Sequence, residues 1–333
     1  MRKELIKMEN NRDILLEIKN LKKSFPIKNF FGKTIGVVNA VNNVSFDIYK
    51  GETFGLVGES GCGKSTLGRC LLKMQDVSDG NIIYNGTDIT TISEKEWNKY
   101  RDKIQIIFQD PYSSLNPNWT ARQIIEEPLK LMGLNKDEIE NKIKNILSIV
   151  RMNEDDMEKF PYEFSGGQRQ RIGIARAVIS EPNFIFCDEP VSALDVSVQA
   201  QVINMLKDLQ KEFKLTYLFT SHDLSMVYYI SDRIGVMYLG NIVEIGDSEE
   251  VFRHPIHPYT KGLISSIPTV EDIEHKYKDI MKGEQPGPMN VPKGCCFSTR
   301  CPYADEICKN DKPELREVKK GHVCACFKYE ELI

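Results

Sequence analysis

The sequence predicts an α/β fold with four parts: a parallel-sheet core, an antiparallel β subdomain, an inserted helical subdomain and a Cys-rich C-terminal tail. Three observations predict it. A glycine-rich stretch, GESGCGKST at 58–66, stands between an apolar strand and a helical pattern. A second apolar run, FIFC at 184–187, ends in two acidic residues. Six of the nine cysteines lie between residues 295 and 326.

The glycine-rich stretch is typical of a phosphate-binding loop. It matches G-x-x-x-x-G-K-[ST], in which backbone amides surround phosphate oxygens, and its glycines allow conformations that a side chain would hinder. The apolar run 53–57 reads as a buried strand and 65–72 as a helix whose N-terminus faces the phosphates. The predicted nucleotide-binding residues of this loop are Gly58, Glu59, Ser60, Gly61, Cys62, Gly63, Lys64, Ser65 and Thr66.

The acidic pair after the second strand predicts phosphoryl-transfer chemistry, which depends mainly on positioning and charge stabilisation. We expect Lys64 to neutralise the β- and γ-phosphates and the Ser65 hydroxyl to bind Mg²⁺. Asp188 would hold the same ion through water, since Mg²⁺ keeps part of its hydration shell. Glu189 is then placed to polarise the attacking water. An acid pair alone carries no weight, but this one directly follows a buried strand and precedes Pro190.

The other elements follow from periodicity. Alternating apolar and polar stretches in 13–50 and 80–90 predict antiparallel strands, with 26–36 as a long hairpin or loop between two of them. Besides the phosphate-loop strand, the parallel core takes strands that end at Gln109, Asp188 and Thr220 and a last one near 233–238. Residues 118–178 have a helical pattern. After Pro268 the composition becomes charged and then rich in Pro, Gly and Cys.

Composition excludes several classes of protein. A hydrophobic fraction of 41% and a charged fraction of 28% are those of a soluble globular chain. A net charge of −4 and a pI near 5.9 give no general attraction to nucleic acid, so no nucleic-acid partner is expected. No apolar run approaches the roughly 20 residues of a membrane helix, and the start, MRKELIKMENNRD, has no secretory h-region. We expect a cytosolic protein that reaches a membrane only through a partner.

The tail cysteines are Cys295, Cys296, Cys301, Cys308, Cys324 and Cys326. Disulfides are rare in a reducing cytosol, where clustered thiols more often bind metal. The spacing matches neither the usual zinc ribbons nor the ferredoxin runs. Spacing alone therefore leaves zinc, an iron–sulfur cluster and unmetallated thiols open.

Taken together, the motifs resemble those of the ATPase subunits of ATP-binding-cassette (ABC) transporters, which have a P-loop NTPase core. The shared motifs are the phosphate loop, Gln109 in IIFQDP, SGGQ at 165–168, the Asp188–Glu189 strand, SALD at 192–195 and His222 in TSHD. In that family, the SGGQ segment of one subunit covers the nucleotide held by the other. The resemblance implies this role for Ser165, Gly166, Gly167 and Gln168. The alternative is that SGGQ is only a turn and helix cap.

The same resemblance assigns roles to three single residues. His222 would contact the γ-phosphate, although a lone histidine at a strand end is usually structural. Gln109 would link the metal site, as a Mg²⁺ ligand, to a transmembrane partner. Phe25 would stack on adenine; its alternatives are a core phenylalanine, or the neighbouring Phe30 and Phe31 in that role.

The C-terminal sequence narrows the family. HPIHPYTKGLISSIP at 254–268 and GCCFSTRCPYADEIC at 294–308 resemble the tail of oligopeptide and dipeptide importer ATPases. Members carry a [4Fe–4S] cluster, for which the positions here are Cys295, Cys301, Cys308 and Cys326, with Zn²⁺ as the alternative. Cys296 and Cys324 depart from the usual pattern and leave the first and last ligands open to a shift. The segments 189–206 and 231–244 resemble the second, "F-type", subunit.

The resemblance implies an ABC nucleotide-binding domain at 1–268, with its helical subdomain at about 113–178, and an importer-type tail at 269–333. The implied function is ATP hydrolysis that powers peptide import at the cytoplasmic face of the cell membrane. The implied partners are a second ABC ATPase, two transmembrane permease subunits and, through these, an extracytoplasmic substrate-binding protein. Nickel chelates or oligosaccharides are alternative cargoes, and a soluble ABC ATPase that moves no solute is the competing class.

Overall fold

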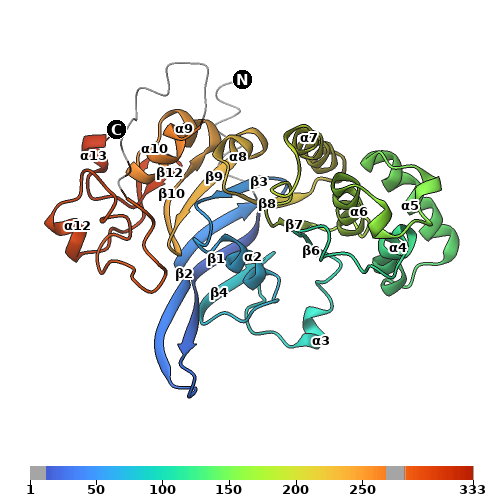
Figure 1. The fold of residues 1–333 in the computed structure, drawn as a ribbon, viewed down its shortest axis with the longest axis horizontal. Helices are drawn as coiled ribbons and strands as arrows, with labels where there is room; N and C mark the ends of the chain where they lie inside the picture. The colour runs from blue at the N-terminus through green and yellow to red at the C-terminus, as the bar shows by residue number, and fades with distance from the viewer. Residues whose placement is uncertain (1–12, 268–280, 282, 333) are drawn as a thin grey trace. The chain divides into compact units, whose positions relative to one another are not determined.

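The computed structural model describes residues 13–267, 281 and 283–332, which form two compact units (Figure 1). The first unit comprises Ile48–Glu52 and Thr91–Phe219, together with Asp13 and Ile14. The second comprises Leu15–Asp47, Thr53–Thr90 and the described residues from Thr220 onward. Of residues 1–13, which lack a secretory h-region, only Asp13 is described. The expected domain boundary at residue 268 also lies outside the described residues.

An antiparallel sheet in the second unit confirms the β subdomain. Its strand order is β2-β1-β4-β5. The strands are β1 (Ile14–Lys28), β2 (Thr34–Tyr49), β4 (Asp79–Tyr84) and β5 (Thr87–Asp88). Leu16 and Ile18 of β1 are buried and Glu17 between them is less so, as the period of two predicts, although Leu15 is buried too. Residues 29–33 form the expected hairpin turn, where the Asn29 side chain accepts bonds from the amides of Phe31 and Lys33.

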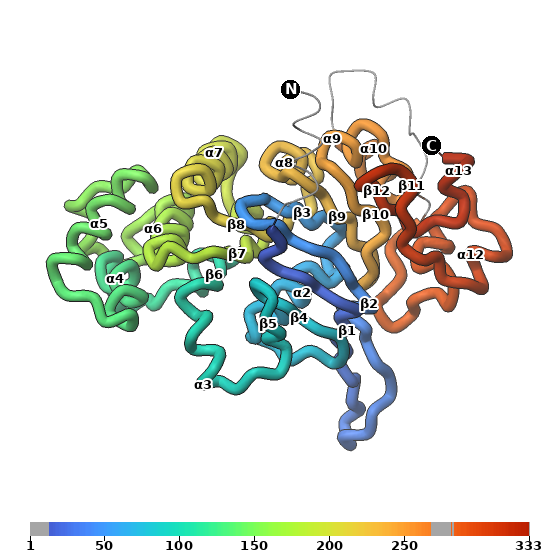
Figure 2. The backbone as a smooth tube through the Cα atoms, turned by 180° about the vertical axis from the view of Figure 1, so that it is seen from behind, coloured from blue at the N-terminus to red at the C-terminus, as the bar shows by residue number. Residues whose placement is uncertain are grey.

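The second unit also contains the strand that leads into the phosphate loop. β3 (Thr53–Val57) runs parallel to β9 (Arg233–Tyr238), which confirms both predicted strands. Beyond β9 the sheet continues antiparallel through β10 (Asn241–Asp247), β12 (His322–Cys324) and β11 (Arg316–Lys319). Figure 2 shows β12 and β11 beside β10. The C-terminal tail therefore supplies two strands to the same sheet, and no pattern in its sequence predicts them.

Short helices complete the second unit. The helix after the phosphate loop is α2 (Lys64–Leu71). The others are α8 (Leu224–Ile230), α9 (Ser248–Arg253), α10 (Pro258–Ser265), α12 (Glu306–Asn310) and α13 (Tyr329–Leu332).

Three parallel strands in the order β8-β7-β6 form the sheet of the first unit. They are β6 (Ile104–Ile107), β7 (Phe184–Cys187) and β8 (Thr216–Ser221), which begins in this unit. All four side chains of β7 are buried, as its unbroken apolar run predicts. Two further helices of this unit are α3 (Glu94–Trp97) and α7 (Val196–Phe213).

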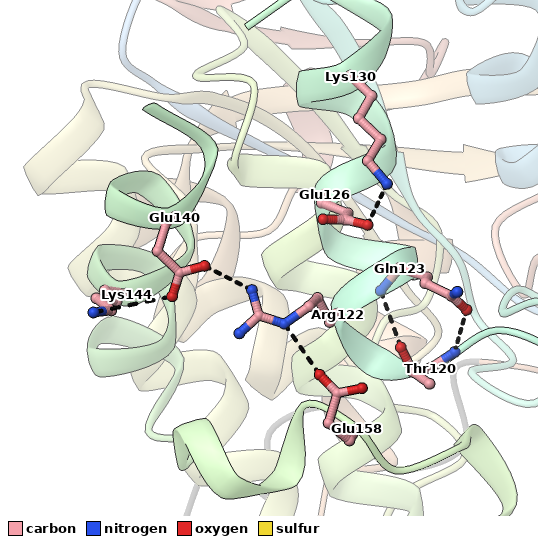
Figure 3. Close-up of polar contacts among 8 residues, drawn as sticks. All are labelled: Thr120, Arg122, Gln123, Glu126, Lys130, Glu140, Lys144 and Glu158. Carbon is pink, nitrogen blue, oxygen red and sulfur yellow. Dashed lines mark hydrogen bonds and ion pairs between the residues drawn. The ribbon is translucent and has the colours of Figure 1, made fainter. Parts of the chain in front are cut away.

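The predicted helical segment of the first unit is confirmed. It contains α4 (Ala121–Leu131), α5 (Lys136–Val150) and α6 (Gly166–Val178), with 3₁₀ turns at Glu154–Asp156 and Pro161–Glu163. Thr120 caps α4, since its hydroxyl accepts from the Gln123 amide and the Gln123 side chain accepts from the Thr120 amide (Figure 3). Such a reciprocal cap satisfies two amides that the first helical turn leaves unpaired.

Arg122 on α4 ties this helical segment together. Its guanidinium contacts Glu140 of α5 at 2.7 Å and Glu158 at 3.3 Å (Figure 3). The hydrogen bond from Arg122 lowers the pKa of the Glu140 carboxyl. The pair Glu126–Lys130 lies one turn further along α4.

In the described part of the chain, no helix is long and apolar enough to cross a membrane.

Candidate functional site

The phosphate loop in the second unit is shaped by close backbone approaches. A Cβ on Gly58 would lie 2.1 Å from the Met237 carbonyl oxygen, and one on Gly63 would lie 2.0 Å from that of Ala40. Gly61 and Gly63 have φ values of 76° and 113°, in the left-handed region. Gly58 is therefore required for space, Gly61 for conformation and Gly63 for both.

The N-terminus of α2 can receive an anion. Gly63 is its first flanking residue and has no side chain to cap the helix, so the first-turn amides face whatever occupies the loop. Lys64 is 3% exposed, and its Nζ donates to the carbonyl oxygens of Gly58 at 2.7 Å and Glu59 at 3.3 Å. The ammonium therefore lies under the loop. Ser65 and Thr66 occupy the first turn of α2, and Ser60 is exposed at the surface of the loop.

Two more predicted site residues belong to the second unit. His222 follows β8 and is exposed, and the next residue, Asp223, caps α8 by accepting from the amides of Ser225 and Met226. Phe25 lies on β1, is partly exposed and has Lys23 Nζ 5.0 Å from its ring centroid. Phe25 is therefore not a core phenylalanine. Phe30 and Phe31 are 99% and 88% exposed in the hairpin turn.

In the first unit, the structure brings three predicted residues to the ends of adjacent parallel strands. Asp188 directly follows β7, is 1% exposed, and its amide donates to the Ile107 carbonyl at 2.9 Å. Glu189 is less buried and accepts a long hydrogen bond from Gln109 Nε2 at 3.4 Å. Gln109 follows β6 and is exposed. This edge can thus present a buried carboxylate, a more accessible carboxylate and an amide to a metal ion and water.

The SGGQ segment also lies in the first unit and starts α6. The Ser165 hydroxyl accepts from the Gln168 amide at 3.3 Å, and Gln168 Oε1 accepts from the Ser165 amide at 2.9 Å. The two glycines lie between them, and a Cβ on Gly167 would meet Val198 at 2.6 Å. The helix cap is thus real, and the exposed Ser165 and Gln168 leave room for a contact outside the chain as well.

The tail cysteines lie in the second unit and influence one another. Cys326 interacts electrostatically with Cys301, Cys295 and Cys308. Burial raises the pKa of Cys301 to about 11 and that of Cys326 to about 12, and it also raises the pKa of Cys308. Hydrogen bonds from Cys296 and then His257 lower the pKa of Cys295 to about 4.

Four cysteine thiols are the donor chemistry of an iron–sulfur or zinc site. Within the described ranges, however, no three His, Cys, Asp or Glu side chains are grouped closely enough to hold a metal ion. The structure therefore gives no support to the expected cluster or to Zn²⁺.

Sequence reasoning missed two residues that contact the phosphate loop. The Tyr259 hydroxyl accepts from the Glu59 amide at 2.9 Å, and Arg300 Nη1 contacts both Glu59 carboxylate oxygens at 3.1 and 2.9 Å. Both residues stand in segments that carried the family resemblance. Nothing in their spacing indicates a partner 200 or 241 residues away, so only the fold could reveal the contact.

Comparison with known proteins agrees with the motifs. The family described as ABC transporter matches residues 41–192, and that described as oligopeptide/dipeptide transporter, C-terminal region, matches 243–308. Oligopeptide transport ATP-binding protein AppF of Bacillus subtilis is 49% identical, over 96% of this chain and 98% of that protein. Oligopeptide transport ATP-binding protein OppF of Haemophilus influenzae is 48% identical, over 96% and 99%.

Solved structures agree on the fold. CbiO1 of Clostridium perfringens, part of the ABC transporter complex cbiONQ, superposes with a TM-score of 0.64 at 29% identity, over 73% of this chain and 92% of that one. The ATP-binding cassette MJ0796, in a dimeric post-hydrolysis state bound to ADP and Pi, gives 0.63 at 26% identity, over 70% and 99%. Since relatives nearly half identical extend over almost the whole chain, the protein belongs to the ATP-binding subunits of ABC transporters, in the oligopeptide/dipeptide family.

Proposed function

We propose that this chain is the ATP-hydrolysing subunit that powers peptide import through a membrane ABC transporter, at the cytoplasmic face of the membrane. The observation that carries the proposal is the uncapped N-terminus of α2 beneath a glycine loop, with the buried Lys64 ammonium against the loop carbonyls. The importer-type C-terminal region supports the peptide class of cargo. We assign the cassette to residues 1–268, its helical subdomain to about 113–178 and the tail to 269–333.

Each residue of the ATP site has a distinct role in this proposal. Lys64 moves from the loop carbonyls to the β- and γ-phosphates, where its charge offsets theirs. Mg²⁺, with ligands from Ser65, Asp188 and Gln109, would supply charge neutralisation at the phosphates. Glu189 accepts a proton from the attacking water. His222 contacts the γ-phosphate, and Phe25 provides a partly exposed ring for the adenine to stack on.

A second ABC ATPase completes the site. The SGGQ residues of this chain cover the partner's ATP, and the partner's equivalent segment covers ATP on this chain's loop. The exposure of Ser165 and Gln168 at the start of α6 supports this role. Two transmembrane permease subunits and an extracytoplasmic substrate-binding protein complete the assembly, and this chain reaches the membrane through the permeases.

We also propose a [4Fe–4S] cluster on Cys295, Cys301, Cys308 and Cys326. The occurrence of these four cysteines within one short tail supports it, and a bound cluster would supply thiolate bonds that cross-link the tail. Protein purified without oxygen should contain iron and sulfide in similar amounts. Cys301→Ser and Cys308→Ser should abolish both, whereas Cys324→Ser should not. Zinc without iron in such preparations would refute the cluster and favour the alternative.

Transport itself is the decisive test. The chain would be reconstituted in proteoliposomes with its partner ATPase, the two permeases and the binding protein, and uptake of a labelled peptide mixture measured with and without ATP. We expect uptake that requires ATP and fails with Glu189→Gln in this chain. ATP hydrolysis that no peptide stimulates, with no peptide uptake, would contradict the peptide assignment.

A further inference from the structure

Arg300 in the tail makes an ion pair with the phosphate loop. Its Nη1 lies 3.1 Å and 2.9 Å from the two carboxylate oxygens of Glu59 and 3.4 Å from the Tyr238 hydroxyl. The Arg300 side chain is 8% exposed and that of Glu59 is 27% exposed. The pair is therefore largely removed from water. A hydrogen bond between charged groups is stronger in such a buried place than at an open surface.

Glu59 is held at three points, two of them by residues from Tyr259 onward. Its amide donates to the Tyr259 hydroxyl at 2.9 Å, its carbonyl accepts from Lys64 Nζ at 3.3 Å, and its carboxylate meets Arg300. Glu59 is the first residue after Gly58, where the chain leaves β3 and turns into the loop. Fixing it fixes the start of the turn whose later amides face the phosphates.

The segment that carries Arg300 is packed firmly enough to position the loop. Phe297 is fully buried, and its ring centroid lies 5.3 Å from that of Tyr238 and 5.4 Å from that of Tyr259. The Arg300 guanidinium carbon lies 5.9 Å from the centroid of the same Phe297 ring. The backbone amide of Arg300 donates to the backbone carbonyl of Phe297 at 3.0 Å. Arg300 is thus anchored to the aromatic cluster that also orients Tyr259.

We propose that Arg300 is a positioning residue for the phosphate loop, through which the C-terminal tail sets the affinity of the loop for ATP. A carboxylate at the loop entrance would repel the phosphates, and the guanidinium both neutralises it and holds it to one side. Without Arg300, the Glu59 side chain can turn toward the anion site and the loop start is less ordered. The inference rests on the proposed ATP-binding function and deepens it.

The test is nucleotide affinity in the full chain. We expect Arg300→Ala to weaken ATP binding about tenfold, because the charge-assisted contacts of Arg300 with Glu59, which order the loop, are lost. The KM for ATP should rise by a similar factor while kcat changes by less than about twofold, since the Asp188–Glu189 edge is untouched. Arg300→Lys keeps the charge and should restore most of the affinity. Binding would be measured with a fluorescent ATP analogue displaced by ATP.

A matched control and a double-mutant cycle complete the design. Arg316→Ala removes another tail arginine, which pairs with Glu314 at 3.6 Å and is 60% exposed, and should leave affinity unchanged. In a Glu59→Gln background, Arg300→Ala should have a much smaller effect, because the pair is already broken. Parent-like affinity of Arg300→Ala, or an equal loss in both backgrounds, would overturn the inference. Failure of the parent itself to bind ATP would instead overturn the proposed function on which it rests.

Discussion

At the scale of single residues, Glu189 has an unusual backbone. Its φ is 42°, in the left-handed region that non-glycine residues rarely occupy, and it stands between the buried Asp188 and Pro190. Such a conformation costs on the order of 1–3 kcal/mol and persists where the surroundings impose it. Here it turns the chain sharply after β7, so that consecutive carboxylates take different environments: one buried, one more accessible.

The first prediction follows from this difference. Glu189→Gln should keep ATP binding but reduce hydrolysis by roughly 10²–10⁴-fold, because the water loses its proton acceptor. The variant should also accumulate a nucleotide-bound dimer with the partner ATPase, detectable by size-exclusion chromatography. Hydrolysis near the parent rate, assayed with the partner present, would remove Glu189 from its assigned role.

Lys64 leads to a separate prediction, on binding. Lys64→Ala should weaken ATP affinity by roughly ten- to a hundredfold, because the charged contact to the phosphates is lost. Nucleotide titration of the isolated chain measures this. The matched control is Lys73→Ala, which should bind ATP normally. Lys73 follows α2, and its side chain donates to the Thr90 carbonyl. Equal affinity of Lys64→Ala and the parent would show that the loop does not hold the phosphates as assigned.

At the scale of elements, a buried carboxylate on β10 holds the tail strand. Glu244 is fully buried and accepts from the amides of Ile256 and His257 at 2.8 and 3.0 Å, and His322 Nε2 of β12 lies 2.7 Å from it. The Glu244 side chain thus connects β10 with the residues just before α10 and with β12 of the tail. Removing the Glu244 carboxylate leaves these buried donors without their acceptor, and buried donors without a partner lower the free energy of unfolding strongly.

Glu244→Ala should therefore destabilise the second unit by about 3–5 kcal/mol. Hydrogen exchange should show the largest loss of protection in β12 and at the start of α10. Glu314→Ala, whose side chain is 81% exposed, is the control and should change stability by less than about 0.5 kcal/mol. A Glu244→Ala protein with parent-like protection in β12 would contradict this account.

The same elements show how far sequence alone can reach. The phosphate loop, β7 and the helical segment were predictable because each is encoded by contiguous residues: a glycine pattern, an apolar run or a 3.6-residue period. The resemblance extended this to the roles of Gln109 and Ser165, which stay predictions. By contrast, β12 has only three residues, and its pairing with Glu244 and Ile245 depends on a register set about 80 residues away in the chain. No local pattern specifies that pairing.

At the scale of the molecule, the tail and the phosphate loop belong to one compact unit. Phe297 is fully buried against Tyr238 and Tyr259, so the tail shares its apolar core with β9 and α10. Phe297→Ala should therefore destabilise this unit by about 3–5 kcal/mol through the cavity that it leaves. Hydrogen exchange measured at rising temperature should show the tail and the phosphate-loop strand opening together. Independent opening of the tail at lower temperature would mean that it folds as a separate domain.

The tail strands have one more consequence, for self-association. With β9 alone as its neighbour, β10 would present a row of unpaired backbone groups, which can recruit a strand of another molecule. β12 covers that row, and β11 then becomes the outermost strand of the described sheet. β11 is only four residues long, and Arg316, Glu317 and Lys319 make it charged. A short, charged border strand is a poor template for further strand addition, so the tail also protects the protein from edge-to-edge aggregation.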